Sequence, residues 1–167
     1  MNLYLIRHAR PATIGDSASS LSPAGQAQAV KLGRMFVRLG VTLDTTSILT
    51  SDLKRAERTG NIIAKSLRLA QSPPPTAVRP IHQFAIPNDV RTLLDNIRTV
   101  VAEEHPTHMF VVWHHPMVGD AFNLLVGSDL LSWPLDAYGA TAHITCSESL
   151  EDGSGTFQWF ILPELLP

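Results

Sequence analysis

Four residues that can bind or attack an anion follow predicted strands. Arg7 and His8 come directly after an apolar run, Arg55 lies in the first turn of a predicted helix, and His114 follows another apolar run. Guanidinium groups form bidentate hydrogen bonds with phosphate oxygens, and imidazoles act as hydrogen-bond donors or as nucleophiles. Ligands of open α/β sheets bind beyond the carboxyl ends of the strands, so these residues are expected to converge on one anion site.

Each of these residues taken alone also has a structural explanation. An arginine on the first turn of a surface helix is usually solvated, and a histidine after a strand is more often hydrogen-bonded than catalytic. The adjacent His114 and His115 suggest zinc, but neighbouring residues point apart and no Cys or carboxylate cluster completes a site. We therefore expect no metal and no cofactor. His82, His105 and His108 are expected to be structural or solvent-facing.

The elements that must position these residues alternate between strand-like and helix-like segments, which favours an α/β fold. Strands are expected at Asn2–Ile6, Ser47–Thr50, Ala77–Ile81, Met109–Trp113, Thr141–Cys146 and Phe157–Leu162. Helices are expected from Ser22 and Pro23 to Gly40, from about Leu53 to Leu67, from a cap at Asn88 to about Val101, and from about Pro116 to Val126. The apolar faces of the first two helices comprise Ala29, Leu32, Phe36 and Leu39 and then Leu53, Ala56, Gly60, Ile63 and Leu67. Asp16 to Ser20 is small and polar and predicts a loop.

Length and composition limit the classes of protein to which this chain can belong. The chain has 167 residues, so we expect one domain over residues 1–167. The net charge of -2 argues against a nucleic acid partner, and no basic run suggests a membrane surface. Cys146 is the single cysteine, so the fold needs no oxidising compartment, and no signal peptide or membrane span is evident. The expected location is the cytoplasm.

Three motifs together resemble those of the histidine phosphatase superfamily. Leu3–Ala9, an apolar strand ending in Arg-His-Ala, is similar to the signature that ends in Arg-His-Gly. Ser51–Thr59 is similar to the second motif, Ser-x-x-x-Arg-Ala-x-x-Thr, and Val111–Pro116 to the third, a strand followed by Gly-His-Asn-Pro. Leu21–Gly25 matches the usual start of the first helix. The motifs stand in family order, each at a strand end, so a chance match is unfavoured.

The resemblance implies a phosphoglycerate mutase-like fold, a three-layer α/β/α sandwich around a central, mostly parallel sheet. Ala9 in place of glycine is common in the branch that resembles SixA-type phosphohistidine phosphatases. Trp113 and His115 replace the usual Gly and Asn around the second histidine. Both replacements leave the two histidines and two arginines in place, and their effect on the pocket wall stays open.

The resemblance also implies a mechanism without a metal. His8 is the expected nucleophile and becomes transiently phosphorylated, while its other ring nitrogen donates to a fixed acceptor. Arg7, Arg55 and His114 are expected to bind the phosphoryl oxygens and stabilise the charge of transfer. Asp89 is a candidate proton donor for the leaving group, although a cap or dipole role at a helix start is favoured for it. His82 is another candidate donor.

The expected substrate is a phosphorylated protein histidine. The region after the predicted third strand has no Glu to serve as an acid, and a phosphohistidine imidazole leaves more readily than an alkoxide. The short chain leaves little room for a cap over the site. A phosphatase of small phosphate esters is the alternative, a mutase is less favoured, and a non-catalytic phosphate-binding domain is least favoured.

Overall fold

The computed structural model describes residues 1–71, 81–87, 89–128 and 133–167. The strands are β1 (Asn2–Arg7), β2 (Thr46–Ser51), β3 (Ile81–Phe84), β4 (His108–Trp113), β5 (Thr141–Thr145) and β6 (Thr156–Ile161). The helices are α1 (Pro23–Arg38), α2 (Lys54–Ala70), α3 (Val90–Glu104) and α4 (Met117–Val126), with short 3-10 turns at Leu43–Thr45 and Pro163–Leu165. Apart from shifted ends, the elements agree with the predicted ranges except at β3, which shares only Ile81 with the predicted third strand. Of the predicted strand Ala77–Ile81 only Ile81 is described, and the predicted cap Asn88 lies outside the described residues.

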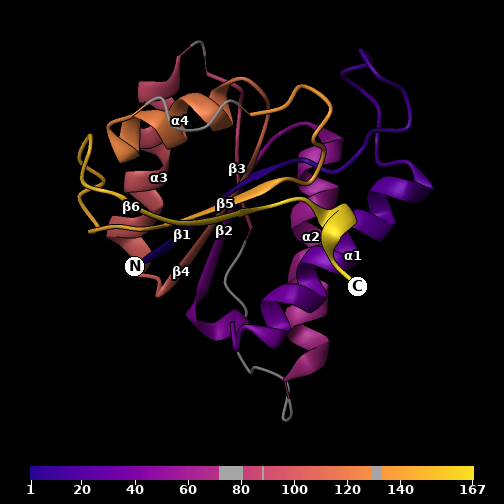
Figure 1. The fold of residues 1–167 in the computed structure, drawn as a ribbon, viewed down its shortest axis with the longest axis horizontal. Coiled ribbons are helices and arrows are strands. Elements are labelled where there is room, and N and C mark those ends of the chain that lie inside the picture. Colours follow the sequence, from indigo (N-terminus) through magenta and orange to yellow (C-terminus); the bar gives the residue numbers. More distant parts are fainter. Residues whose placement is uncertain (72–80, 88, 129–132) are drawn as a thin grey trace.

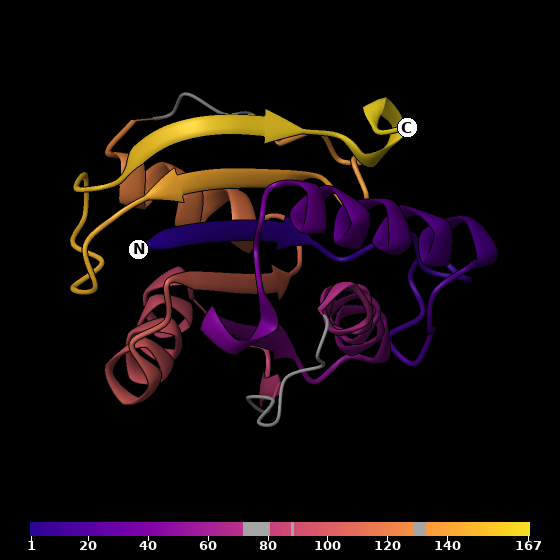
Figure 2. The same cartoon turned by 90° about the horizontal axis from the view of Figure 1, so that it is seen from below.

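The six strands form one sheet in the order β3-β2-β4-β1-β5-β6. The pairs β2–β3, β2–β4 and β1–β4 are parallel, whereas β5 runs antiparallel to both of its neighbours. Figure 2 shows β6, β5, β1 and β4 stacked in this order. The predicted, mostly parallel sheet is confirmed.

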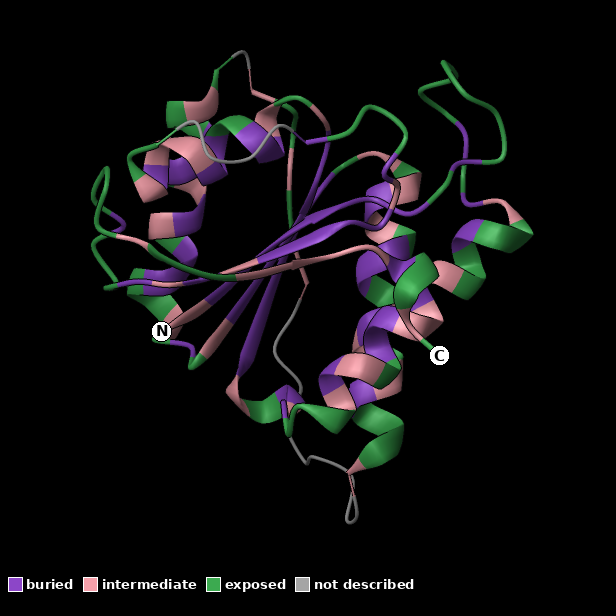
Figure 3. Ribbon diagram, viewed as in Figure 1, coloured by how far each residue is buried: buried purple, intermediate pink, exposed green. Residues whose placement is uncertain are grey.

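Helices cover both faces of the sheet and give the predicted three-layer sandwich. Figure 1 shows α1 and α2 on one side and α3 and α4 on the other. Phe36 of α1 and Ile63 of α2 are fully buried in one core, and Phe122 of α4 in the other. The central strands are almost entirely buried (Figure 3), as expected of strands covered on both faces. Among the described residues, no helix combines the length and apolar character that crossing a membrane would require.

Helix α1 begins and ends as its sequence predicts. The Ser22 hydroxyl accepts a hydrogen bond from the Gly25 backbone N–H at 3.0 Å, and Pro23 occupies the first turn. Gly40, with φ of +77°, follows the end of the helix in the left-handed conformation that favours glycine. The prediction that Leu39 belongs to the buried face was wrong. The helix ends at Arg38, and the Leu39 side chain is 55% exposed.

The parallel strands end at one edge of the sheet and deliver their following residues to the same place. Arg7 at the end of β1 is in register with Trp113 at the end of β4. Ser51 ends β2 next to β4. The first turn of α1 packs closely against the chain that leaves β1 here. A Cβ added at Gly25 would overlap the Arg10 carbonyl oxygen, so this close packing requires glycine.

We expect Gly25→Ala to destabilise the protein by about 1–3 kcal/mol, because backbone must move to admit the methyl group. The free energy of unfolding from urea titration measures this loss. Ala24→Ser, one residue earlier and exposed, serves as the control. Equal urea midpoints for Gly25→Ala and the wild type would contradict the close approach.

Candidate active site

The structure brings Arg7, His8, Arg55 and His114 together at this edge of the sheet. The ring centroids of His8 and His114 lie 4.9 Å apart. The Arg55 Nε donates a hydrogen bond to His8 Nε2 at 3.2 Å. Residues separated by more than 100 positions in the sequence therefore form one cluster, and Arg7, His8 and His114 are buried in it.

The His8 ring is held in one tautomer. Its Nδ1 lies 2.8 Å from the Ala9 carbonyl oxygen, which can only accept, so Nδ1 carries the proton. Nε2 is then unprotonated, and its lone pair accepts the hydrogen bond from Arg55 Nε. Burial lowers the pKa of His8 to about 4, and the charges of Arg55 and Arg7 act in the same direction. The ring is neutral at neutral pH, with Nε2 as its nucleophilic atom.

The two arginines are fixed by backbone carbonyl groups. Arg7 Nη1 donates to the carbonyl oxygens of Pro134 at 3.1 Å and Leu135 at 2.5 Å. The Arg7 guanidinium also lies 4.2 Å from the ring centre of Tyr138. Its Nε is buried and has no hydrogen-bond partner among the described residues. A buried guanidinium with a free donor is suited to an anion oxygen.

Arg55 is held by the loop that precedes α1. Its Nη1 donates to the carbonyl oxygens of Asp16 at 3.3 Å and Ser17 at 3.2 Å. Its Nε is thereby directed at His8. The loop predicted at Asp16 to Ser20 therefore helps to build the site, a role that its sequence did not indicate.

His114 is paired with a buried serine. Its Nε2 lies 2.5 Å from the Ser51 hydroxyl, and Ser51 is fully buried. The pKa of His114 is lowered to about 3, first by burial and then by the neighbouring His8, Arg55 and Arg7. His114 is therefore also neutral at neutral pH, and it can act through hydrogen bonds.

Ser51 and Thr59 are motif residues to which the sequence analysis gave no individual role. The Thr59 hydroxyl accepts from the Ala9 backbone N–H at 3.1 Å and donates to the Arg55 carbonyl oxygen at 2.7 Å. It thus connects the chain beyond β1 to the first turn of α2. Tyr138 was also missed, because it lies in a loop far from the motifs and carries no local signal.

A cavity of about 200 Å³ opens over three residues of this cluster, Arg7, His8 and Arg55, whereas His114 is not among its lining residues. It is lined by Arg7, His8, Pro11, Thr13, Gly15, Asp16, Ser17, Arg55 and Tyr138. Asp16 is the acidic residue among those that line it, and its Oδ1 accepts from the Ala18 backbone N–H at 2.9 Å. In the described part of the chain, no cluster of three or more His, Cys, Asp or Glu side chains could hold a metal ion.

The two candidate proton donors predicted from the sequence make other contacts. Asp89 is the N-cap of α3, where Oδ1 accepts from the Thr92 backbone N–H at 2.9 Å and Oδ2 from its hydroxyl at 3.1 Å. These bonds lower the pKa of the Asp89 carboxyl group. The His82 Nε2 lies 2.8 Å from Glu104. Neither Asp89 nor His82 lines the cavity, and a donor role for either stays a prediction.

The two residues that depart from the third motif lie differently. Trp113 is fully buried in the core beneath α3 and α4, with its ring 6.2 Å from that of His114. The His115 side chain is half-buried. Neither residue lines the cavity.

Comparison with known proteins agrees with this arrangement. The family model of the histidine phosphatase superfamily (branch 1) matches residues 3–76, which include Arg7, His8 and Arg55. This part of the chain, which holds the first two motifs, is therefore similar to the histidine phosphatase superfamily. A search of curated proteins gives no match.

Solved structures share the fold of this chain along nearly its whole length. The protein histidine phosphatase SixA complexed with tungstate is 23% identical, with a TM-score of 0.72 and coverage of 98% of this chain and 97% of that one. A phosphoserine phosphatase mutant from Entamoeba histolytica, in complex with phosphoserine, is 14% identical, with a TM-score of 0.63 and coverage of 95% of each chain. A mycobacterial glucosyl-3-phosphoglycerate phosphatase is 12% identical, with a TM-score of 0.60 and coverage of 94% and 96%. At these identities the likeness establishes the fold.

We expect both site histidines to stay neutral down to about pH 5 because their pKa values are depressed to about 4 for His8 and about 3 for His114. NMR of ¹⁵N-labelled imidazoles should show His8 protonated at Nδ1 and unprotonated at Nε2. A His8 titration midpoint near 6.5, or a proton on Nε2, would contradict the geometry. The unfolded chain takes up these protons near pH 6.5. The contribution of these histidines to stability is therefore present above pH 6.5 and is lost as the pH falls towards 4.

Proposed function

We propose that this chain is a histidine phosphatase that removes the phosphoryl group from a phosphorylated histidine of a protein, with His8 as the nucleophile. The hydrogen-bonded orientation of His8 carries the proposal. Nδ1 is committed to the Ala9 carbonyl group, so the unprotonated Nε2 accepts from Arg55, and the His114 ring lies beside the His8 ring. A site that only bound phosphate would need hydrogen-bond donors such as the arginines. It would gain nothing from a histidine whose Nε2 is kept unprotonated.

The same contacts suggest the course of the reaction. When the phosphoryl group enters, Arg55 Nε exchanges its hydrogen bond with His8 Nε2 for one to a phosphoryl oxygen. Nε2 then attacks phosphorus as the bond to the leaving nitrogen breaks, and that nitrogen takes up a proton. Arg7, Arg55 and His114 stabilise the charge on the oxygens. Water next attacks the phosphorylated His8, which releases inorganic phosphate and restores the neutral ring.

The size of the cavity supports a protein substrate. About 200 Å³ is smaller than the roughly 300–1,000 Å³ of pockets that enclose a whole small ligand. The cavity suits a phosphoryl group with the remainder of the substrate outside it, as when a phosphorylated side chain is displayed on a protein. The similar fold of the protein histidine phosphatase SixA supports the same substrate class. Location in the cytoplasm stays a prediction from the sequence.

One observation favours the alternative, a phosphatase of small phosphate esters. Asp16 lines the cavity and could protonate an alkoxide leaving group. Such a group needs acid assistance more than an imidazole does. A phosphoserine phosphatase with the same fold shows that this fold also serves ester substrates.

The deciding experiment compares hydrolysis of a phosphohistidine-bearing protein with hydrolysis of an aryl phosphate. We expect the wild type to favour the phosphohistidine, and His8→Ala to lose about 10⁴-fold or more in kcat on both, as for removal of a nucleophile. Phosphate should be trapped on His8 by rapid acid-free quenching and mass spectrometry. His105→Asn, at an exposed histidine before β4 and at the opposite edge of the sheet, is the control.

The outcomes separate the candidate functions. A preference for the aryl phosphate, with His8 still phosphorylated, would move the function to small phosphate esters. An active and well-folded His8→Ala variant would remove the nucleophile assignment. Binding of phosphate without any phosphorylated His8 would favour the non-catalytic domain.

We expect Asp16→Asn to lower ester hydrolysis by about 10²-fold and to change phosphohistidine hydrolysis less than about threefold. Asp89→Asn retains a good helix cap but has no proton to donate, so it is the matched test of the other carboxylate. Its rates on both substrates should stay within about threefold of wild type. A selective loss of ester hydrolysis in Asp89→Asn instead would identify Asp89 as the donor.

A further inference from the structure

Positive charge is concentrated on two helices of an otherwise acidic chain. Helices α1 and α2 carry eight of the thirteen Lys and Arg residues and a single acidic residue, Glu57. The remainder of the chain holds the other five basic residues and fourteen of the fifteen acidic ones. The net charge of -2 therefore hides a strongly basic face.

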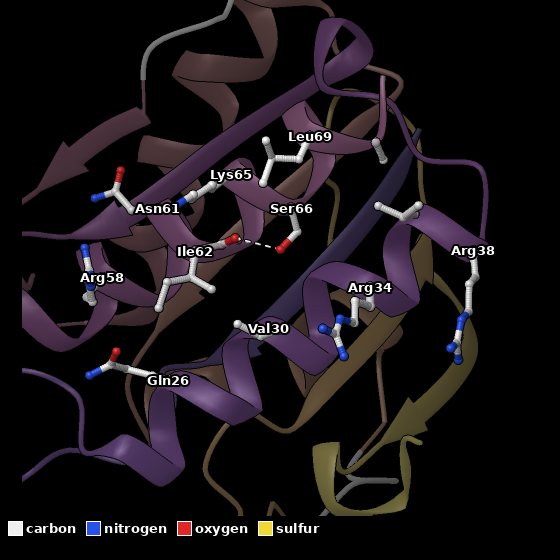
Figure 4. A pocket seen from close by; sticks show the side chains of 12 residues that line it. Gln26, Val30, Arg34, Arg38, Arg58, Asn61, Ile62, Lys65, Ser66 and Leu69 are labelled. Carbon is white, nitrogen blue, oxygen red and sulfur yellow. Dashed lines mark hydrogen bonds between the residues drawn. The ribbon is translucent and has the colours of Figure 1, made fainter. Parts of the chain in front are cut away.

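A groove with a volume of about 960 Å³ lies between these helices, and we call it the α1/α2 groove. Arg34 and Arg38 of α1 and Arg58 and Lys65 of α2 line it, and Val30 and Ile62 lie between the two helices (Figure 4). None of the described residues that line it is acidic. Among the described residues, none of these four cations has a carboxylate partner.

A strip of apolar side chains, which includes Val30, Ile62 and Leu69, runs along the groove, and the uncharged polar residues Gln26, Asn61 and Ser66 also line it. The Ser66 hydroxyl donates to the Ile62 carbonyl oxygen of its own helix at 3.0 Å, so its polar group is already satisfied. Leu69, at the far end, leaves 75% of its side chain exposed. An apolar strip with unpaired cations on both sides matches a segment that has an apolar face flanked by Asp and Glu.

The groove starts beside the active site. Arg58 lies one helical turn beyond Arg55, which donates to His8. Leu69 lies fourteen residues beyond Arg55, which at 1.5 Å per residue is about 20 Å further along α2. A helix of about four turns can lie along this length while another part of the same protein reaches the cavity.

We infer that the α1/α2 groove is a docking site for an acidic, amphipathic helix of the phosphorylated protein substrate. The inference rests on the proposed function, because a small phosphate ester would need no second contact 20 Å from the site. The groove adds affinity and selects among phosphorylated proteins, whereas His8 and the arginines act on the phosphoryl group. Nucleic acid is disfavoured as the occupant because the remainder of the chain is acidic.

The test is the KM for a histidine phosphotransfer protein phosphorylated in vitro, measured beside the KM for an aryl phosphate. We expect the double variant Arg34→Glu and Lys65→Glu to raise the first KM at least tenfold, and to leave both kcat values and the second KM within about twofold. The wild-type KM for the phosphoprotein should also rise with ionic strength. Arg68→Glu introduces a negative charge on the same helix outside the groove, and it should raise the KM less than about twofold.

Each outcome bears on the docking site. Equal phosphoprotein KM values for the double variant and the wild type would overturn docking and leave the phosphohistidine activity in place. An equal rise in the Arg68→Glu variant would overturn it as well, since the effect would then be one of overall charge. Binding of phosphatidylserine vesicles or DNA that the double variant loses, with an unchanged phosphoprotein KM, would assign the groove to those ligands instead. A wild type without activity on phosphohistidine would overturn the proposed function and docking together.

Discussion

The site depends on keeping two guanidiniums and two imidazoles together, with Arg7, His8 and His114 buried and Arg55 half-buried. Burial and the arginine charges lower the pKa values of His8 and His114, so both rings remain neutral and repulsion is avoided. The arginines are oriented by backbone carbonyl groups, which stabilise a guanidinium without neutralising its charge. The cluster therefore keeps a positive charge that a phosphoryl group can compensate.

The sheet fixes the positions of these four side chains relative to one another. β1 lies between β4 and β5, and β4 lies between β1 and β2, so the chain ends that carry His8 and His114 cannot shift independently. Further hydrogen bonds fix the segments beyond the strands. The Thr59 hydroxyl joins the Ala9 backbone to α2, and Ser51 holds His114. His8 is thus positioned by rigid elements, whereas the loop around Asp16 and the loop at Tyr138 complete the cavity.

The charge distribution divides the molecule into two functional regions. In the proposed function the cavity holds a phosphoryl group through pre-oriented donors, and such interactions are strong where water is excluded. The basic face of α1 and α2 is exposed, where single charges contribute little to affinity but influence the encounter of partners. A protein substrate would use both regions. Its recognition by the α1/α2 groove would then be separable from the removal of its phosphoryl group in the cavity.

The sequence alone predicted the order of the elements, the α/β layers and the four residues that lie together at the sheet edge, while the chemical roles of these residues stay predictions. Alternation of apolar runs with helical periodicity specifies the elements locally, and the Ser22 cap and Gly40 turn specify the ends of α1 through bonds a few residues apart. The prediction that Leu39 belongs to the buried face of α1 was wrong because the helix ends one residue earlier, at Arg38. The exact end of a helix depends on local hydrogen bonding, which hydrophobic periodicity does not show. The motif residues could be predicted because they stand at fixed distances from strand ends.

Only the tertiary structure decided how those residues are held. The tautomer of His8 depends on the direction of the Ala9 carbonyl group, and Arg7 depends on carbonyl groups more than 120 residues away. Asp16 and Tyr138 enter the cavity through loops whose sequences give no periodic signal. The groove between α1 and α2 exists because two basic helices pack side by side on one face of the sheet. Contacts between distant segments are set by packing, so no local pattern in the sequence can specify them.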